Sequence, residues 1–331
     1  MTPHAQFCIC PWWPADAIPP RPAGGLDSPV WPAESPAVPL FRRHDGDLIR
    51  GAPPIRRIMP YLMRTRTESV VLHETVYRVA AASAWLKAYN RTHPAHATLF
   101  DLYAYACGQA LAARPELNRF VSGGRVYQRR GVQVSFVVKR EMSDAGIGTT
   151  VKIEMLPEEP FAAFIARIGA TIASARAHEL AVDREAALFV RLPGPLLRAV
   201  VGLARRLDAW NLYPRFMTKN DPMYASLFLA NLGSAGISDA FHHLYEYGTV
   251  SIFGAMSAVR RLPFVEGDTV VARPGLSVRW TFDERIHDAF YAARSLRIVQ
   301  RILEAPVRHL GAPEGDPRFT PAAPEPPVPR S

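Results

Sequence analysis

A predicted strand is joined to a predicted helix by the segment Thr281-Phe282-Asp283-Glu284-Arg285-Ile286-His287-Asp288-Ala289-Phe290-Tyr291. Upstream of it, residues 275–282 alternate between apolar and polar side chains, which is typical of a strand with one buried face. Downstream, apolar residues recur at helical spacing as far as residue 303. Binding and catalytic groups often lie on loops that rigid elements hold in place, so this charged junction is a candidate site.

The same segment is also compatible with an ordinary turn. An aspartate or glutamate in it would then cap the following helix, and Arg285 would form an ion pair at the surface. The pattern of the segment alone leaves both interpretations open.

The composition bounds the kind of protein to which this junction belongs. The chain has 331 residues and 48% hydrophobic content, enough for one large or two ordinary domains with a substantial core. Its net charge is +9, but the basic residues are nearly all arginines scattered among acids, which favours local binding of anionic groups. No nucleic-acid-binding motif is present, and we expect no nucleic-acid partner. Three cysteines do not make a disulfide framework, so a reducing compartment, the cytoplasm, is expected.

Both ends of the chain are rich in proline. We predict a disordered arm over residues 1–40, one folded domain over 41–309 and a second disordered tail over 310–331. The arm has no signal-peptide pattern. Cys8 and Cys10 offer two metal ligands, but no second pair completes a tetrahedral set, so no metal site is predicted.

Within the folded part, helical and strand-like patterns alternate. Helices are predicted at 80–90, 98–113, 160–177 and from 290 to 303, and strands at 69–77, 126–127, 132–138, 149–153, 224–230, 248–258 and 269–282. Gly123 and Gly124 predict a turn between the first short strands. Helices that return onto a sheet predict the α/β class, as a two-layer sandwich.

Residues 183–210 predict an amphipathic helical insertion. A membrane span is excluded by Arg191, Pro193, Arg198 and Arg205. The helix either packs on protein, in this chain or in a neighbouring subunit, or lies on a membrane surface. We favour packing on protein and expect Leu196, Val200 and Leu203 to be buried together.

Four stretches together carry a resemblance to a known family. They are Ile55-Arg56-Arg57-Ile58 with Met63 and Ser69, residues 100–120 with Pro115-Glu116-Leu117-Asn118, Asn231-Leu232-Gly233, and the segment from Asp283 to Ala289. In this order and at this spacing, residues 55–306 resemble the catalytic domain of the 2-oxoacid dehydrogenase acyltransferases and, more distantly, chloramphenicol acetyltransferase.

The resemblance implies a chloramphenicol acetyltransferase-like fold, a two-layer α/β sandwich with a mixed sheet. It also implies a homotrimer with active sites at the subunit interfaces, in which coenzyme A or acyl-CoA is a substrate and meets an acyl carrier such as lipoyl-lysine. The proline-rich arm is too short for a lipoyl domain, and no lysine resembles a carrier lysine. We therefore expect no covalent lipoyl group on this chain, and either an acyl-carrier or lipoyl protein acting in trans or free acyl-CoA.

The sequence departs from the family pattern at the positions that carry chemistry. The family histidine that acts as general base is replaced by Glu284, and the family glycine by Ala289. The two hydroxyl positions, one of which would donate to the tetrahedral oxyanion, are Phe228 and Ala230. The candidate catalytic residues are Glu284, His287, Asp288 and His243, and the candidate ligand-binding residues are Asn231, Gly233, Ser234 and Arg285.

A glutamate is a weaker base than the histidine it replaces. An imidazole with a pKa of ~6.5 is well matched to a thiol of ~8.5, whereas a carboxylate of ~4.3 has about 3 kcal/mol less driving force. Burial would raise the pKa of Glu284 and recover part of this difference, whereas pairing with Arg285 would oppose that rise in pKa. His287 and the pair His242 and His243, with Glu246 in reach if that segment is helical, are the alternative bases.

A structural role for each histidine remains open. A metal site formed by His242, His243 and Glu284 would require a convergence that the sequence does not show. Two functions follow: an acyltransferase with an altered base, or a catalytically silent relative that serves as a trimeric scaffold or acyl-CoA-binding module.

Overall fold

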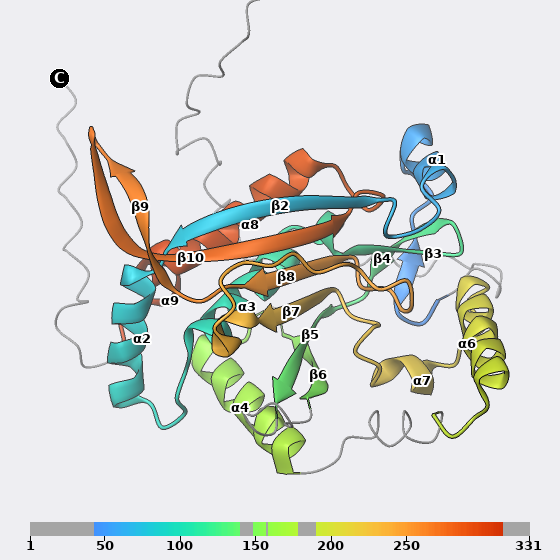
Figure 1. Ribbon diagram of the computed structural model, residues 1–331, viewed down its shortest axis with the longest axis horizontal. Helices are drawn as coiled ribbons and strands as arrows, with labels where there is room; N and C mark the ends of the chain where they lie inside the picture. The colour runs from blue at the N-terminus through green and yellow to red at the C-terminus, as the bar shows by residue number, and fades with distance from the viewer. Residues whose placement is uncertain (1–42, 140–147, 157, 178–189, 314–331) are drawn as a thin grey trace, which may run out of the picture. The chain divides into compact units, whose positions relative to one another are not determined.

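The computed structural model describes residues 43–139, 148–156, 158–177 and 190–313 (Figure 1). All of the described residues belong to one compact unit. The predicted arm over 1–40 and most of the predicted tail over 310–331 lie outside the described residues. The expected boundaries of the folded domain therefore stay a prediction.

A seven-stranded mixed sheet forms the centre of this unit. Its strands are β2 (Val70–Arg78), β5 (Val132–Lys139), β6 (Gly148–Met155), β7 (Leu227–Asn231), β8 (Ile252–Met256), β9 (Arg260–Glu266) and β10 (Thr269–Asp283). Six of them follow the order β2-β10-β8-β7-β5-β6, and β9 pairs with β10. The β5–β7 and β7–β8 pairs are parallel and the others are antiparallel. The predicted mixed sheet is confirmed.

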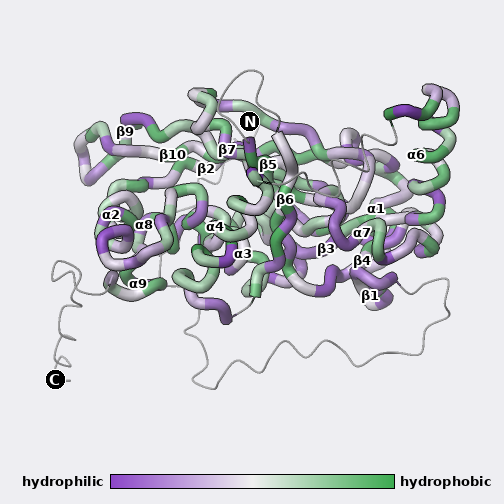
Figure 2. The backbone as a smooth tube through the Cα atoms, turned by 90° about the horizontal axis from the view of Figure 1, so that it is seen from below, coloured by the Kyte–Doolittle hydropathy of each residue, from purple (hydrophilic) through white to green (hydrophobic). Residues whose placement is uncertain are grey.

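One layer of helices covers one face of this sheet, and Figure 2 shows the two layers from the side. The helices are α2 (Ala80–Thr92), α3 (Leu99–Ala113), α4 (Phe161–Ala177), α8 (Ala289–Glu304) and the short α9 (Pro306–Leu310). The main core lies between the layers. The predicted two-layer α/β sandwich is therefore confirmed.

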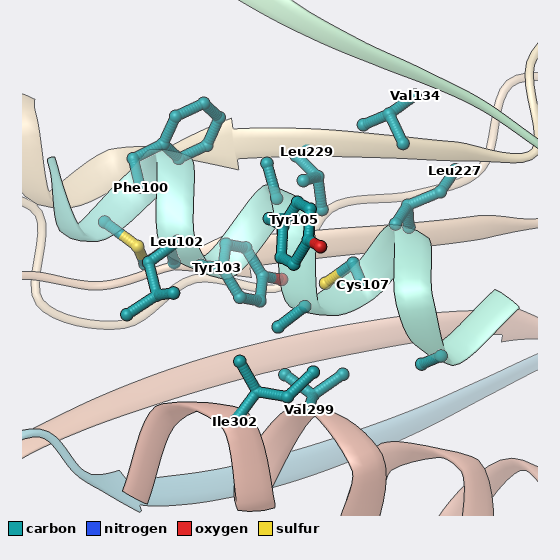
Figure 3. Close-up of a cluster of buried hydrophobic side chains, with 14 of the residues drawn as sticks. Phe100, Leu102, Tyr103, Tyr105, Cys107, Val134, Leu227, Leu229, Val299 and Ile302 are labelled. Atoms are coloured by element: carbon teal, nitrogen blue, oxygen red, sulfur yellow. The ribbon is translucent and has the colours of Figure 1, made fainter. Parts of the chain in front are cut away.

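Helix α3 runs through the middle of this core. It is apolar almost all round and buried on both sides, as such helices are. In Figure 3 its side chains lie between Val134 and Leu229 of the sheet and Ile302 of α8. A capping box formed by Thr98 and Asp101 begins the helix, because each side chain accepts from the backbone N–H of the other.

A small sheet and several short elements lie outside the two main layers. The small sheet has the order β1-β4-β3, with β1 (Gly46–Leu48), β3 (Arg119–Ser122) and β4 (Arg125–Arg129). The remaining elements are α1 (Pro54–Leu62), α6 (Gly194–Ala209), α7 (Arg215–Lys219) and the 3₁₀ turns η2 (Pro115–Asn118) and η3 (Leu232–Ala235). The turn predicted at Gly123 and Gly124 is confirmed, with positive φ at both. A Cβ at Gly123 would lie 2.3 Å from the carbonyl oxygen of Ala209 in α6.

Three strands, β1, β3 and β9, were not predicted from the sequence. Strand β9 contains two arginines and Pro263, and most of its side chains are exposed, so it shows no apolar alternation. It is held by its antiparallel ladder with β10, across a turn in which Gly267 has a φ of 59°. Strand β3 has only four residues and follows directly after η2, which left too short a pattern to recognise.

The burial predicted for α6 is not found within this chain, and its packing on a neighbouring subunit stays a prediction. Leu196 and Leu203 are 49% and 55% exposed, and Val200 is only half-buried. The buried residue of this helix is Asp208, which accepts hydrogen bonds from Arg43 Nη2 and Ser122 Oγ, both at 2.8 Å. A polar anchor at the C-terminal end, rather than an apolar stripe, thus holds α6 on the domain. Among the described residues, no helix is long and apolar enough to cross a membrane.

Candidate active site

The turn at the end of β10 is built on a buried ion pair. Asp283, the last residue of β10, is fully buried and accepts from Arg285 Nε at 2.8 Å and Nη2 at 2.7 Å. It also accepts from Ser69 Oγ at 3.0 Å, and Arg285 donates from Nη1 to the carbonyl of Met63. The guanidinium of Arg285 is therefore paired with Asp283 and not with Glu284, and the surface ion pair of the ordinary-turn interpretation is wrong.

Glu284 lies between Asp283 and Arg285 in sequence, but its side chain lines a cavity outside their ion pair. Its backbone N–H donates to the carbonyl of Ser69 at 2.9 Å, and its half-buried side chain lines a cavity of about 50 Å³. His73 and His287 line the same cavity, together with apolar residues of β2, η2 and α8. Within the part of the chain that the structure describes, the carboxylate of Glu284 has no hydrogen bond or ion pair. This cavity is the candidate active site.

His287 enters the same cavity with both ring nitrogens engaged. Its Nε2 lies 2.7 Å from Glu116 Oε2, and its Nδ1 accepts from the backbone N–H of Asp288 at 2.8 Å. This pattern assigns the proton to Nε2, which donates to Glu116. The ring also packs on Tyr291, with centroids 3.9 Å apart. His287 would have to release a hydrogen bond before it accepted a proton from a substrate.

Asp288 is the N-cap of α8. Its Oδ1 accepts from the backbone N–H of Tyr291 at 2.8 Å, and its Oδ2 accepts from Arg56 Nη2 at 3.3 Å. The hydrogen bond from Tyr291 lowers the pKa of the Asp288 carboxyl, and the nearby charge of Arg56 lowers it further. Capping, the role given to this segment by the ordinary-turn interpretation, is thus performed by Asp288.

His242 and His243 do not line this cavity. The ring of His242 stacks on Phe253 at 3.9 Å, its Nδ1 lies 2.7 Å from the carbonyl oxygen of His243, and burial lowers its pKa. His243 is exposed, and the segment is not helical. Glu246 instead accepts from the backbone N–H of Thr67. Among the described residues, no group of three or more His, Cys, Asp or Glu side chains is placed to hold a metal ion.

The predicted ligand-binding residues after β7 form a tight turn. Asn231 Oδ1 accepts from the N–H of Ser234 at 3.1 Å, and Ser234 Oγ donates to the carbonyl of Asn231 at 2.8 Å. A Cβ at Gly233 would lie 2.5 Å from the carbonyl oxygen of Ser257, so only glycine fits there. These contacts fix the backbone of η3, and they leave Ser234 exposed.

The positions that carry hydroxyls in the family have none in this chain. Phe228 is buried and stacks on Phe253, with centroids 5.1 Å apart, and Ala230 packs against the same small cluster. An aromatic pair thus occupies the place expected for an oxyanion donor.

Three residues that build the site were not predicted from the sequence as site residues. His73 lies on β2 opposite Trp280 of β10, which brings it to the cavity of Glu284. Ser69 binds Asp283, and Glu116 holds His287. The antiparallel pairing of β2 with β10 is the signal that would have located His73, because the segments that pair are both strand-like in sequence.

Comparison with known proteins agrees with the motifs and the fold. Residues 215–310 match the family model of the 2-oxoacid dehydrogenases acyltransferase (catalytic domain). The resemblance predicted from the four motifs is confirmed. The matched residues include η3, the whole of β10, the turn with Glu284, and α8. The comparison with curated proteins found no match.

Solved structures of acyltransferases share this fold at low sequence identity. A probable dihydrolipoamide acetyltransferase from Listeria monocytogenes 4b F2365 matches with a TM-score of 0.54 and 13% identity, over 82% of this chain and 98% of the other. The cubic core of the pyruvate dehydrogenase multienzyme complex matches with a TM-score of 0.54 and 14% identity, over 79% of this chain and 94% of the other. The Azotobacter vinelandii dihydrolipoamide acetyltransferase matches with a TM-score of 0.52 and 15% identity, over 79% of this chain and 94% of the other. That structure was used to investigate a serine, a histidine and an asparagine in its catalytic mechanism. These similarities establish the acyltransferase fold.

Proposed function

We propose that this protein transfers an acyl group between coenzyme A and a carrier thiol or small acceptor, with Glu284 as the general base. One observation carries the proposal. The carboxylate of Glu284 lines a cavity without a hydrogen bond or ion pair from any described residue. The motif resemblance makes Glu284 the counterpart of the family's histidine. A carboxylate that is not engaged in the fold is available to accept a proton.

The reaction assigns a role to three residues of the cavity, Glu284, His287 and Asp288. Glu284 accepts the proton of the attacking thiol, whose sulfur bonds to the acyl carbonyl carbon; the bond to the leaving sulfur then breaks, and Glu284 returns the proton to that sulfur. The weaker basicity of a carboxylate costs about 3 kcal/mol relative to imidazole. His287 and Asp288 are positioning residues, because their hydrogen bonds fix the start of α8 beside the cavity.

A catalytically silent scaffold or acyl-CoA-binding module is the second candidate. It is favoured by the aromatic pair of Phe228 and Phe253, which leaves no hydroxyl at the expected oxyanion position. Loss of one such donor costs ~10²–10³ in rate. The turn formed by Asn231 and Ser234 would serve ligand binding in either case.

We further propose a homotrimer, in which a second copy completes the site. Strand β2 is an edge of the sheet and carries Leu72, which is 54% exposed. Phe290 at the start of α8 is exposed beside the cavity. Unpaired edges and exposed apolar residues are commonly covered by a partner.

In such a trimer, a larger channel would admit coenzyme A and an acyl-carrier or lipoyl protein in trans. A monomeric mass in light scattering at micromolar concentration would contradict the assembly.

Acyl-transfer assays on variants of Glu284 test the base. Replacement of Glu284 by Gln preserves the shape of the side chain and should lower acyl transfer by ~10²–10⁴. Glu158→Gln, at an exposed position outside the cavity, is the matched control and should leave the rate unchanged. Glu284→His restores the family residue and should give only a modest gain in a weakly active parent, since the oxyanion hydroxyl is still missing.

The remaining outcomes separate the alternatives. If Glu284→Gln keeps full turnover while His73→Gln, His287→Ala or His243→Ala abolishes it, an imidazole is the base. If the parent binds several acyl-CoAs but transfers none of them to thiol or amine acceptors, the silent module is the correct function.

A further inference from the structure

A second cavity, of about 190 Å³, opens on the other side of the turn at the end of β10. It shares no lining residue with the cavity of Glu284. Four arginines line it, namely Arg64 and Arg66 after α1, Arg205 of α6 and Arg285. Its volume is far above the ~10–15 Å³ that one water needs, so it has room for a small ligand.

Arg66 is the buried cation of this cavity. Arg66 is only 5% exposed. Its Nη1 and Nη2 donate to backbone carbonyls, including that of Gly248 at 2.8 Å. Its Nε has no partner, and no carboxylate of the described residues forms an ion pair with it. Burial lowers its pKa, because a buried charge without a counterion is unfavourable. An anion in the cavity would relieve this cost.

The two acids of the cavity wall are already engaged elsewhere. Asp208 accepts from Arg43 Nη2 and Ser122 Oγ, both at 2.8 Å. Glu246 Oε1 accepts from the N–H and hydroxyl of Thr67 at 3.1 and 3.3 Å. Neither carboxylate forms an ion pair with an arginine of the cavity wall within the described ranges.

The remaining charges leave the cavity positive. Arg285 is neutralised by Asp283. Asp208 and Asp45 are together neutralised by Arg43 and Arg129. Three guanidinium groups, those of Arg64, Arg66 and Arg205, then face the single carboxylate of Glu246, which leaves a surplus of two positive charges. The side chains of Arg64 and Arg205 have no hydrogen bond or ion pair to any residue that the structure describes.

We propose that this arginine-lined cavity binds a phosphate-type dianion. Two surplus positive charges match the charge of a phosphate monoester or of inorganic phosphate, and guanidinium groups bind phosphate oxygens through paired N–H donors. The proposal does not depend on acyl transfer, because the cavity and its arginines are separate from Glu284. The dianion is either free phosphate or a phosphate group of a larger ligand, such as the 3′-phosphate of coenzyme A.

Calorimetric titration of the full chain with inorganic phosphate tests the proposal. The double variant Arg64→Gln with Arg205→Gln removes the two guanidinium groups that no described residue engages and keeps the buried Arg66. It should weaken phosphate binding by roughly tenfold to a hundredfold, as expected for lost charged hydrogen bonds. Arg198→Gln, on the same helix but outside the cavity, is the control for general loss of positive charge and should change the affinity less than twofold at the same ionic strength. Thermal denaturation of each variant checks that it is folded.

Parallel titrations with coenzyme A and dephospho-coenzyme A identify the source of the phosphate. If the double variant weakens binding of coenzyme A but not of dephospho-coenzyme A, the 3′-phosphate occupies the cavity. If it weakens inorganic phosphate and leaves coenzyme A unchanged, a free phosphate or another phosphorylated ligand does. Either result supports the site. Absence of saturable phosphate and coenzyme A binding in the parent, or equal weakening by Arg198→Gln, would overturn it.

Discussion

Glu284 and Arg285 are neighbours in sequence, yet they line two cavities of opposite character. The cavity of Glu284 is small and mostly apolar, and its carboxylate is not engaged by any described residue. The cavity of Arg285 is larger and polar, and its acids are engaged in hydrogen bonds. Asp283, fully buried between them, fixes the turn that separates the two side chains. One short turn thus provides a site suited to proton transfer and another suited to holding an anion.

Replacement of Asp283 should have the largest effect, because both cavities depend on it. Asp283→Asn leaves Arg285 buried without its counterion, and loss of one partner of a buried pair costs about 3–5 kcal/mol. Urea denaturation measures this as a fall in unfolding free energy, with Asp268→Asn in the exposed β9–β10 turn as the control. A cost equal to that of the control would show that the pair does not hold the turn.

Replacement of Asp208 should affect the arginine-lined cavity alone. Asp208→Ala removes the acceptor of Arg43 and Ser122, and a hydrogen bond to a charged group contributes ~1.5–3 kcal/mol. We expect the unfolding free energy to fall by about 2 kcal/mol and any acyl-transfer rate at saturating acyl-CoA to stay unchanged, measured on the same preparation. A parallel loss of acyl transfer would mean that the two cavities are coupled through the turn.

The smallest effect should come from the charge of Asp288, on the side of Glu284. Asp288→Asn keeps an N-cap oxygen but removes the charge. The pKa of Asp288 is lowered in the folded state, so its charge stabilises the folded protein at pH values above the unfolded pKa, near 3.8. That contribution is lost as the pH falls through the folded pKa. The unfolding free energy of the wild type should exceed that of the variant by ~0.3–1 kcal/mol at neutral pH, and this difference should vanish in acid. Urea denaturation across this pH range measures it, and a difference that persists in acid would contradict the assignment.

The sequence predicted the fold well because the fold depends on local patterns. Alternation along β10 and helical spacing along α8 place the junction correctly, and the order of motifs indicates the acyltransferase sandwich. The sequence did not determine what covers the apolar face of α6, because helical periodicity shows only that an apolar stripe exists. Leu196 and Leu203 form part of such a stripe, while the anchor of the helix is the polar Asp208.

The candidate site was only partly predictable, because its contacts join distant parts of the chain. Glu284 was singled out by its place in the motif, and it lines a cavity. The hydrogen bond between His287 and Glu116 joins residues 171 positions apart and has no local signal in the sequence. Nor did the sequence show that His243 would lie outside the cavity of Glu284. Roles that depend on which side chains meet require the tertiary structure.

The link between Ser69 and Asp283 also constrains how the chain folds. The two residues are 214 positions apart, and the antiparallel ladder of β2 with β10 joins the same two regions. During synthesis β2 therefore remains without its partner strand until nearly the whole domain has left the ribosome, and contacts of such long range form slowly. A chain that ends before β10 should expose an unpaired edge, so shortened forms of this protein are expected to aggregate or require chaperones.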